Sequence, residues 1–478
     1  MAVLLRKSRG ALQFVKTRPG LPGILNSRIF SCSSYHCKSN NTSRNGYTLH
    51  SSFLGLPGYS VRFQASLHSK ALQLEDHDYS VNDQDWDFPG GKVPFTTKIK
   101  FTADSSEDRI HCYRILDSSG HQILSNTSEM ISKELAVKLY SSMVTLQMLD
   151  TIFNEAQRQG RISFYITSYG EEAVNIASAA ALSNDDVILP QYREHGVLLW
   201  RGFSLQEFAN QLFGNRADYG KGRQMPIHYG SNKLNYITVS SPLATQIPQA
   251  VGVAYSLKME KKDACVVTYF GDGSSSEGDF HAGLNFAAVL DAPVIFFCRN
   301  NGWAISTPIT DQFRSDGIAA KGQAYGIPSI RVDGNDVLAV YDAVRKAREM
   351  AIKEQRPVLI EALTYRVGHH STSDDSTKYR ALEEIEHWKT ARNPIFRYRN
   401  WVERQGWWNE EQETELRKSV RKQLMNAIQV AEQLDTPPLT DLFTDVYHDM
   451  PSNLKEQERS LKETIKKHPQ DYPSGFVV

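Results

Sequence analysis

Hydrophobic residues follow two different periods in the central part of the chain, residues 128–385. Spacings of three and four, as at Leu135, Leu139, Met143 and Leu146, predict a helix near the start of this region. Uninterrupted apolar runs alternate with such helical stretches further on, and these runs are typical of strands buried on both faces. The alternation predicts an α/β domain over 128–385, with a parallel sheet covered by helices on both faces.

One stretch predicts the connection between neighbouring strands. An apolar run over 264–270 is followed by a polar loop over 271–276, a helical pattern over 277–290 and a second apolar run over 293–298. A strand, a helix and a strand in this order form a parallel unit. A similar order of elements is predicted over 335–364, where a helical pattern precedes another apolar run.

The two ends of the chain differ from this domain. Residues 76–127 are polar and are interrupted by Pro89-Gly90-Gly91, which predicts an extended N-terminal tail that wraps a neighbouring chain. Near the other end, Asn409 can cap a helix with a single apolar stripe, and a charged segment follows. We therefore expect a helical C-terminal region over 386–478.

The first 74 residues contain ten basic and no acidic residues among many serines. This composition is typical of an organelle transit peptide, and the arginines favour a mitochondrial one over a plastid one. A basic arm without a targeting role is the alternative. We predict that residues 1–75 are a transit peptide and disordered segment, and that the mature protein lies in the mitochondrial matrix.

Composition removes several other classes of protein. The 54 basic and 54 acidic residues balance, so the total charge gives no reason to expect a nucleic-acid or membrane-surface partner. No uncharged apolar run approaches the roughly 18 residues of a membrane-spanning helix. The five cysteines have neither metal-ligand nor disulfide-framework spacing, and reduced thiols are expected.

Candidate chemistry lies where the run over 264–270 ends. Ligands of parallel sheets gather at the carboxyl ends of strands, where Gly271 and Gly273 let a phosphate approach the backbone and Asp272 offers an oxygen to a divalent cation. Twenty-six residues separate Gly273 from Asn300-Asn301, the length of one helix and one strand. Asp-Gly and Asn-Gly also form ordinary turns, but their spacing across a strand–helix–strand unit favours a joint site.

Magnesium fits such a site, because it takes six oxygen ligands and few protein carboxylates beside phosphates. Asp272, Asn301, a backbone carbonyl near Trp303, two phosphate oxygens and a water would complete the shell. Calcium accepts looser geometry, so the spacing alone leaves the identity of the metal open.

Four segments carry a resemblance to a known family. The segment GDGSSSEGDFHAGLNFAAVLDAPVIFFCRNNGWAIST, which begins at Gly271, resembles the thiamine diphosphate motif of 2-oxoacid dehydrogenase alpha subunits. The others are QYREHG from Gln191, SSPLATQIPQAVG from Ser240 and YRVGHHSTSDDSTKYR from Tyr365. The likeness covers most of residues 100–450 and is nearest to the branched-chain type. It implies a three-layer thiamine diphosphate-binding fold.

The resemblance also implies a role for individual residues. Those expected to contact the cofactor are Tyr192, Arg193, Ser241, Leu243, Gly271, Gly273, Arg299 and the active-site histidine, His370. Those that match a potassium site are Ser240, Pro242, Thr245 and Gln246. Ser371 matches a phosphorylated serine beside the active site, whereas Ala381 stands where a second such serine would be expected. A charge at Ser371 should disorder its loop by repulsion from Asp374-Asp375.

The activity implied is oxidative decarboxylation of the 2-oxo acids derived from valine, leucine and isoleucine. The acyl group would pass to a lipoyl group on the dihydrolipoyl transacylase core. The glutamate that activates the cofactor ring is expected on a beta subunit, in an alpha2-beta2 heterotetramer, and a regulatory kinase and phosphatase are possible partners. Thiamine diphosphate, Mg²⁺ and K⁺ are the cofactors implied.

Three other functions compete with this one. The pyruvate dehydrogenase alpha subunit shares the cofactor motif, but its loop usually reads Gly-His-Ser-Met-Ser-Asp where this chain has GHHSTSDD from Gly368. A nicotinamide-binding enzyme would need a third glycine after Gly271 and Gly273. A non-catalytic scaffold subunit would have no reason to keep all four of Asp272, Asn301, Arg193 and His370.

Overall fold

The computed structural model describes residues 86–88, 91–93, 99, 109–123 and 131–472. The chain divides into two units, residues 1–97 and 98–478. The predicted transit segment lies outside the described residues. In the first unit, β1 (Trp86–Phe88) and β2 (Gly91–Val93) form an antiparallel pair.

The second unit contains a six-stranded sheet in the order β3-β9-β10-β6-β5-β4, and every neighbouring pair in it is parallel. Its strands are β3 (Cys112–Tyr113), β4 (Val187–Leu189), β5 (Val266–Gly271), β6 (Val294–Asn300), β9 (Ser329–Asp333) and β10 (Val358–Leu363). The parallel α/β prediction is confirmed. Strand β6 runs two residues beyond its predicted end, so Asn300 still pairs with Leu363 of β10.

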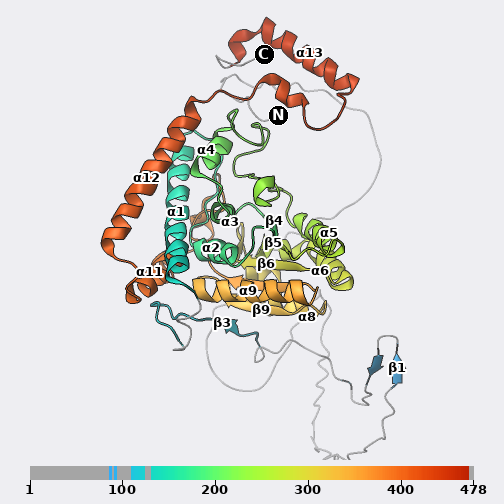
Figure 1. Ribbon diagram of the computed structural model, residues 1–478, viewed down its shortest axis with the longest axis vertical. Helices are drawn as coiled ribbons and strands as arrows, with labels where there is room; N and C mark the ends of the chain where they lie inside the picture. Colours follow the sequence, from blue (N-terminus) through green and yellow to red (C-terminus); the bar gives the residue numbers. More distant parts are fainter. Residues whose placement is uncertain (1–85, 89–90, 94–98, 100–108, 124–130, 473–478) are drawn as a thin grey trace, which may run out of the picture. The chain divides into compact units, whose positions relative to one another are not determined.

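Helices cover both faces of this sheet (Figure 1). Alternate residues of β5 show the division, because Val267 and Tyr269 pack into one buried cluster whereas Val266 and Phe270 pack into another. The helices of the first cluster are α1 (Lys133–Arg158), α2 (Glu172–Ala180), α3 (His195–Trp200), α4 (Leu205–Phe213), α9 (Val337–Lys353), α11 (Pro394–Arg404) and α12 (Glu410–Gln433). Those of the second are α5 (Gln246–Met259) and α6 (Gly278–Leu290), with α8 (Ala319–Gln323) against β9 and β10.

Short elements complete the unit. A hairpin of β7 (Trp303–Ala304) and β8 (Thr307–Pro308) precedes α7 (Ile309–Gln312), and η2 (Asp272–Ser276) links β5 to α6. After β10 come η3 (Ser376–Lys378) and α10 (Leu382–Thr390), and after α12 come η4 (Leu439–Phe443), α13 (Ser452–Lys467) and η5 (Pro469–Asp471). In the described part of the chain, no helix is long and apolar enough to cross a membrane.

Part of the segment expected as an extended tail belongs to the sheet. Strand β3 pairs with β9, and the Ile115 and Leu116 side chains that follow it are buried. Asp336 holds this segment in place, since its Oδ2 atom accepts hydrogen bonds from both backbone N–H groups, at 2.7 and 2.6 Å, while Oδ1 caps α9. Sequence pattern missed this because β3 is only two residues long.

Two helix starts follow from capping residues. Asn409 caps α12 as predicted, with its Oδ1 atom accepting from Gln412 N at 2.9 Å. The first long helix begins at Lys133, capped by the Ser132 hydroxyl, a few residues after the predicted start of the domain at residue 128.

Candidate active site

A cavity of about 400 Å³ lies at the carboxyl ends of β5 and β6. It brings together every residue predicted to contact the cofactor or magnesium: Tyr192, Arg193, Ser241, Leu243, Gly271, Asp272, Gly273, Arg299, Asn301, Trp303 and His370. These residues come from segments as far apart as QYREHG and YRVGHHSTSDDSTKYR. Further lining residues are Gln191, Ser274, Glu277, Ala304, Ile305 and Arg366.

Asp272 is the first residue after β5, and its side chain is almost fully buried, with 1% of the residue exposed. Its Oδ2 atom accepts a hydrogen bond from Gln312 Nε2 at 2.7 Å. Burial raises the pKa of this carboxyl, although the Gln312 hydrogen bond acts in the opposite direction. A cation at this position would therefore stabilise the ionised form.

Gly271 and Gly273 have different structural requirements. A Cβ on Gly273 would lie 2.8 Å from the Ala304 Cβ, whereas one on Gly271 would have no contact closer than 3.7 Å, to Gln191 Oε1. Neither glycine has a positive φ angle. The chain turns directly after β5 as the short helix η2 without needing the conformational freedom of glycine, and close packing on β7 explains Gly273.

The paired asparagines have different partners, with Asn300 as the last residue of β6 and Asn301 just beyond its end. Asn300 Nδ2 donates to Glu361 Oε1 at 2.8 Å, away from the cavity lining. Asn301 lines the cavity, where its Nδ2 atom donates to Glu171 Oε1 at 2.9 Å and its Oδ1 atom accepts from Trp303 N at 3.2 Å. Of the two, Asn301 is the candidate ligand.

Arg299 lies between two buried carboxylates. Its Nη1 atom is 2.8 Å from Glu171 Oε2, and its Nε atom donates to Glu194 Oε1 at 3.0 Å. These charges raise the pKa of Arg299, even though burial by itself would lower it. Arg299 therefore stays charged with only part of its donor set left for a ligand.

Two other buried guanidinium groups have no carboxylate within ion-pair distance in the described part of the chain. Arg193 donates to the carbonyl oxygens of Thr167 and His370, at 2.7 and 2.6 Å. Arg366 donates to Ile305 O at 2.7 Å and to the Tyr379 hydroxyl at 2.8 Å. Burial lowers the pKa of both, that of Arg366 to about 10, with the neighbouring Arg193 contributing. This is an environment that favours an added anion.

His370 lies against both of these arginines. Its Nδ1 atom is 3.2 Å from Arg193 Nη2 and 3.3 Å from Arg366 Nη1. Because a guanidinium can only donate, Nδ1 must be the acceptor and Nε2 carries the proton. Burial and then the two positive charges lower the pKa of His370 to about 3. The ring is therefore neutral and can donate only through Nε2.

The loop after His370 is fixed by Asp374, whose Oδ2 atom accepts from His370 N at 2.7 Å and from the Tyr379 hydroxyl at 2.6 Å. Ser371 belongs to this loop, and its carbonyl accepts from Asp374 N at 3.1 Å. It lines a separate cavity of about 320 Å³ that also contains Arg158.

The residues predicted to form a potassium site lie around the start of α5. Thr245 Oγ1 donates to Pro242 O at 3.0 Å and lies 3.4 Å from Ser240 Oγ, so three oxygens meet there. Gln246 faces the sheet with its amide nitrogen, which donates to Tyr269 O at 2.9 Å. None of these four residues lines the main cavity.

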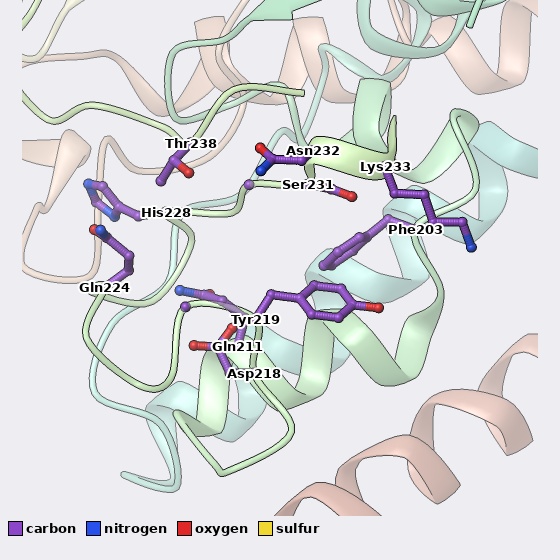
Figure 2. Close-up of a pocket in the computed structure, with 12 residues that line it drawn as sticks. Phe203, Gln211, Asp218, Tyr219, Gln224, His228, Ser231, Asn232, Lys233 and Thr238 are labelled. Carbon is purple, nitrogen blue, oxygen red and sulfur yellow. The ribbon is translucent and has the colours of Figure 1, made fainter. Parts of the chain in front are cut away.

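A further cavity of about 390 Å³ contains none of the residues predicted from the sequence (Figure 2). The Phe203 and Tyr219 rings pack edge-on at one end, and His228 and Gln224 lie at the other (Figure 2). His228 Nε2 is hydrogen-bonded to Ser241 Oγ, which lines the main cavity. The two cavities are thus connected through one hydrogen bond.

Sequence reasoning assigned no role to several residues that organise the main cavity: Glu171, Gln191, Glu194, Gln312 and Arg366. Three of them lie inside motifs that the resemblance singled out, and a closer reading of those motifs could have found them. Glu171 and Gln312 lie in no such motif. Their roles depend on contacts that only the folded chain brings together.

Comparisons with known proteins agree with this site. The family model described as the dehydrogenase E1 component matches residues 140–440, which contain every predicted site residue. The chain belongs to the dehydrogenase E1 component family.

Relatives of known function narrow the class further. The chain is 61% identical, over the full length of both proteins, to the "2-oxoisovalerate dehydrogenase subunit alpha 1, mitochondrial" of Arabidopsis thaliana. It is 66% identical to the corresponding alpha 2 subunit of that plant, over 84% of this chain and 85% of the relative. It is 50% identical to the human alpha subunit, over 84% of this chain and 90% of the relative. The predicted branched-chain alpha-subunit type is confirmed over the pyruvate type, and the names agree with the predicted mitochondrial compartment.

Proposed function

We propose that this chain is the alpha subunit of a 3-methyl-2-oxobutanoate dehydrogenase (2-methylpropanoyl-transferring) in the mitochondrial matrix. It would act on branched-chain 2-oxo acids together with a beta subunit. The main cavity would hold the diphosphate and metal end of thiamine diphosphate.

The observation that supports this most strongly is the pair of buried guanidinium groups without carboxylate partners, Arg193 and Arg366. Burying a charge is costly unless an opposite charge compensates it. A diphosphate in the same cavity supplies that charge, and the planar fork of arginine suits phosphate oxygens.

The metal donors also fit a phosphate ligand. Among the described residues, two carboxylates line the cavity with Asn301, Asp272 and Glu277, and Asp272 is the one predicted to bind the metal. In the described part of the chain, no group of three or more His, Cys, Asp or Glu side chains could hold a metal ion unaided. Magnesium with one protein carboxylate needs oxygens from its ligand, which a diphosphate provides.

The cofactor, when bound, supplies an electron sink for decarboxylation of a 2-oxo acid. The residues of this chain would position and neutralise its diphosphate end. His370, neutral and protonated on Nε2, can donate one hydrogen bond into the cavity. Buried Asp272 and Asn301 would hold the metal, with Tyr192, Arg193 and Arg299 around the diphosphate, Ser241 beside it and Leu243 nearer the ring.

Potassium would be held at the start of α5. Ser240 Oγ, Pro242 O and Thr245 Oγ1 already lie close together, and oxygen donors of this kind suit a cation of low charge. The loop carries Ser241 and Leu243 into the cavity. Ordering this loop would therefore order one wall of the cofactor site.

A beta subunit is expected to cover the outer surface of α5 and α6. Five large apolar side chains are exposed there, namely Tyr255, Met259, Phe286, Leu290 and Val289, the last with 73% of its surface accessible. An apolar surface of this kind marks an interaction site. The same two helices flank the loop with Ser240 and the cavity loop at Asp272, so a partner there would also face the cofactor.

Regulation and acyl transfer are further parts of the proposal. Ser371, in the loop fixed by Asp374, would be phosphorylated by a kinase and restored by a phosphatase. A lipoyl group of the transacylase core would approach the cavity past His370 in the same loop. Adding a phosphate beside ionised Asp374 introduces repulsion within that loop.

Co-expression with the beta subunit tests the proposed function. The purified pair should release carbon dioxide from 3-methyl-2-oxobutanoate much faster than from pyruvate, and the alpha chain alone should release none. Preference for pyruvate would assign the chain to the other type, and absence of activity on any 2-oxo acid would favour a scaffold role.

A further inference from the structure

Asn301 has one orientation that its surroundings allow. Its Nδ2 atom faces the buried Glu171 carboxylate, and its Oδ1 atom faces the N–H group of Trp303. Reversing the amide would place oxygen against oxygen on one side and two donors against each other on the other. Glu171 therefore fixes which atom of Asn301 is left for a cation, and that atom is Oδ1.

Glu171 is itself held rigidly. It is fully buried, and its second oxygen lies 2.8 Å from Arg299 Nη1. That oxygen forms an ion pair with Arg299 but accepts no hydrogen bond from the described residues, and Glu171 does not line the main cavity. It acts on the site through Asn301 and Arg299.

Asp272 is arranged in the same way by Gln312. The Gln312 Nε2 atom lies between two acceptors, Asp272 Oδ2 at 2.7 Å and Thr307 O at 3.3 Å, which fixes the orientation of this amide. In the part of the chain that the structure describes, no other side chain binds Asp272. One carboxylate oxygen is therefore occupied, and Oδ1 is left.

The oxygen of the Gln312 amide also indicates that a ligand binds at this site. Its Oε1 atom is buried and has no hydrogen-bond partner among the described residues. A buried acceptor without a partner is costly, and water bound to a nearby metal is a donor that could satisfy it.

We propose that Glu171 and Gln312 are positioning residues for the divalent metal. Each binds the one atom of Asn301 or Asp272 that the metal does not use, and leaves the two Oδ1 atoms for the cation. This inference rests on the proposed cofactor site, and it adds two residues from segments that no motif connects.

Glu194 provides a matched control. Like Glu171, it is buried against Arg299, and its two oxygens accept from two donors, Arg299 Nε and Gln191 N. A glutamine at position 171 has only one acceptor oxygen to offer Asn301 and Arg299. A glutamine at position 194 likewise has only one to offer Arg299 and Gln191. Both substitutions remove the same charge beside Arg299, but only Glu171→Gln changes the group that accepts from Asn301.

The test is a titration of the co-expressed alpha and beta pair, freed of metal, with MgCl₂ at a fixed concentration of thiamine diphosphate. Tryptophan fluorescence is a suitable readout because Trp303 lines the cavity. Glu171→Gln and Gln312→Ala should each raise the half-saturating Mg²⁺ concentration about tenfold or more, the range found for residues that orient metal ligands. Glu194→Gln should raise it less than about threefold, which we take as the upper limit for a residue outside that group.

The possible outcomes separate the two proposals. An unchanged half-saturating Mg²⁺ concentration in Gln312→Ala would overturn the role of Gln312. Equal increases of this concentration in Glu171→Gln and Glu194→Gln would mean that Glu171 acts only through its charge beside Arg299. A wild-type pair without saturable response would overturn the cofactor site itself. If Glu171→Gln does not fold, Glu171→Asp repeats the comparison, because it keeps the charge but shortens the reach to Asn301.

Discussion

Arg193 Nη2 donates a hydrogen bond to His370 Nδ1 across 3.2 Å, and this contact determines the state of the histidine. A charged donor on Nδ1 prevents its protonation. Burial of the ring, followed by the charges of Arg193 and Arg366, lowers the pKa of His370 to about 3. The cavity therefore contains a histidine that remains neutral throughout the physiological range.

The first prediction concerns acid stability and His370. The unfolded histidine takes up a proton below pH 6.5, whereas the folded one does not until about pH 3. Stability due to this group is therefore complete above pH 6.5 and is lost as the pH falls toward 3, by about 2 kcal/mol between pH 6.5 and 5. Thermal unfolding of the co-expressed pair should lose less stability over this interval in His370→Asn than in the wild type. An equal loss would show that His370 is protonated normally.

The second prediction concerns Glu172, which is buried at the start of α2. Burial raises its pKa to about 8. Because the unfolded carboxyl ionises near pH 4.5 and the folded one near 8, raising the pH between these values favours unfolding. Glu172→Gln removes this pH-dependent loss of stability. The thermal midpoint of the variant minus that of the wild type should therefore be larger at pH 8 than at pH 5, by the equivalent of at least about 1 kcal/mol. A constant difference would contradict the raised pKa.

The third prediction compares the two glycines. Gly273→Ala places a methyl group 2.8 Å from the Ala304 Cβ, whereas Gly271→Ala has space around it. Without cofactor, Gly273→Ala should lower the free energy of unfolding by about 1–3 kcal/mol, and Gly271→Ala should change it much less. Equal losses from both would mean that the turn itself needs glycine.

The fourth prediction concerns the apolar surface on α5 and α6. Phe286→Glu and Val289→Glu should prevent co-purification of the beta subunit without unfolding the alpha chain, since both side chains are exposed. Val446→Glu changes an equally exposed apolar residue elsewhere on the chain and serves as the control. Normal recovery of the pair in both α6 variants would place the partner on another surface.

The fifth prediction concerns the loop after His370. Ser371→Glu should abolish transfer of the acyl group to the lipoyl domain, because its charge repels Asp374 in the same loop. Ser373→Glu places the same charge at an exposed position outside the Ser371 cavity, where solvent screens it, and provides the control. Digestion by trypsin should cut the Ser371→Glu loop faster than the wild-type loop, and unchanged turnover and digestion would remove Ser371 from the regulatory site.

The sequence predicts the parallel sheet, and the placement of Asp272 near Asn301, because both follow from patterns within short stretches of the chain. Asp272 and Asn301 could be brought together from the length of one helix and one strand, and β5 and β6 are adjacent in the structure as that spacing requires. Glu171 could not be placed, because it reaches Asn301 from 130 residues earlier in the chain and has no local pattern of its own. Strand β3 was missed for a related reason, since its position depends on Asp336, more than 200 residues away.

The central claim is that this cavity binds a diphosphate through a divalent metal. Calorimetric titration of the co-expressed pair in Mg²⁺ should give saturable binding of thiamine diphosphate, and binding should be lost in EDTA, in Asp272→Ala and with thiamine that lacks the diphosphate. Thiamine binding as tight as that of thiamine diphosphate, or binding unaffected by EDTA and by Asp272→Ala, would contradict the claim.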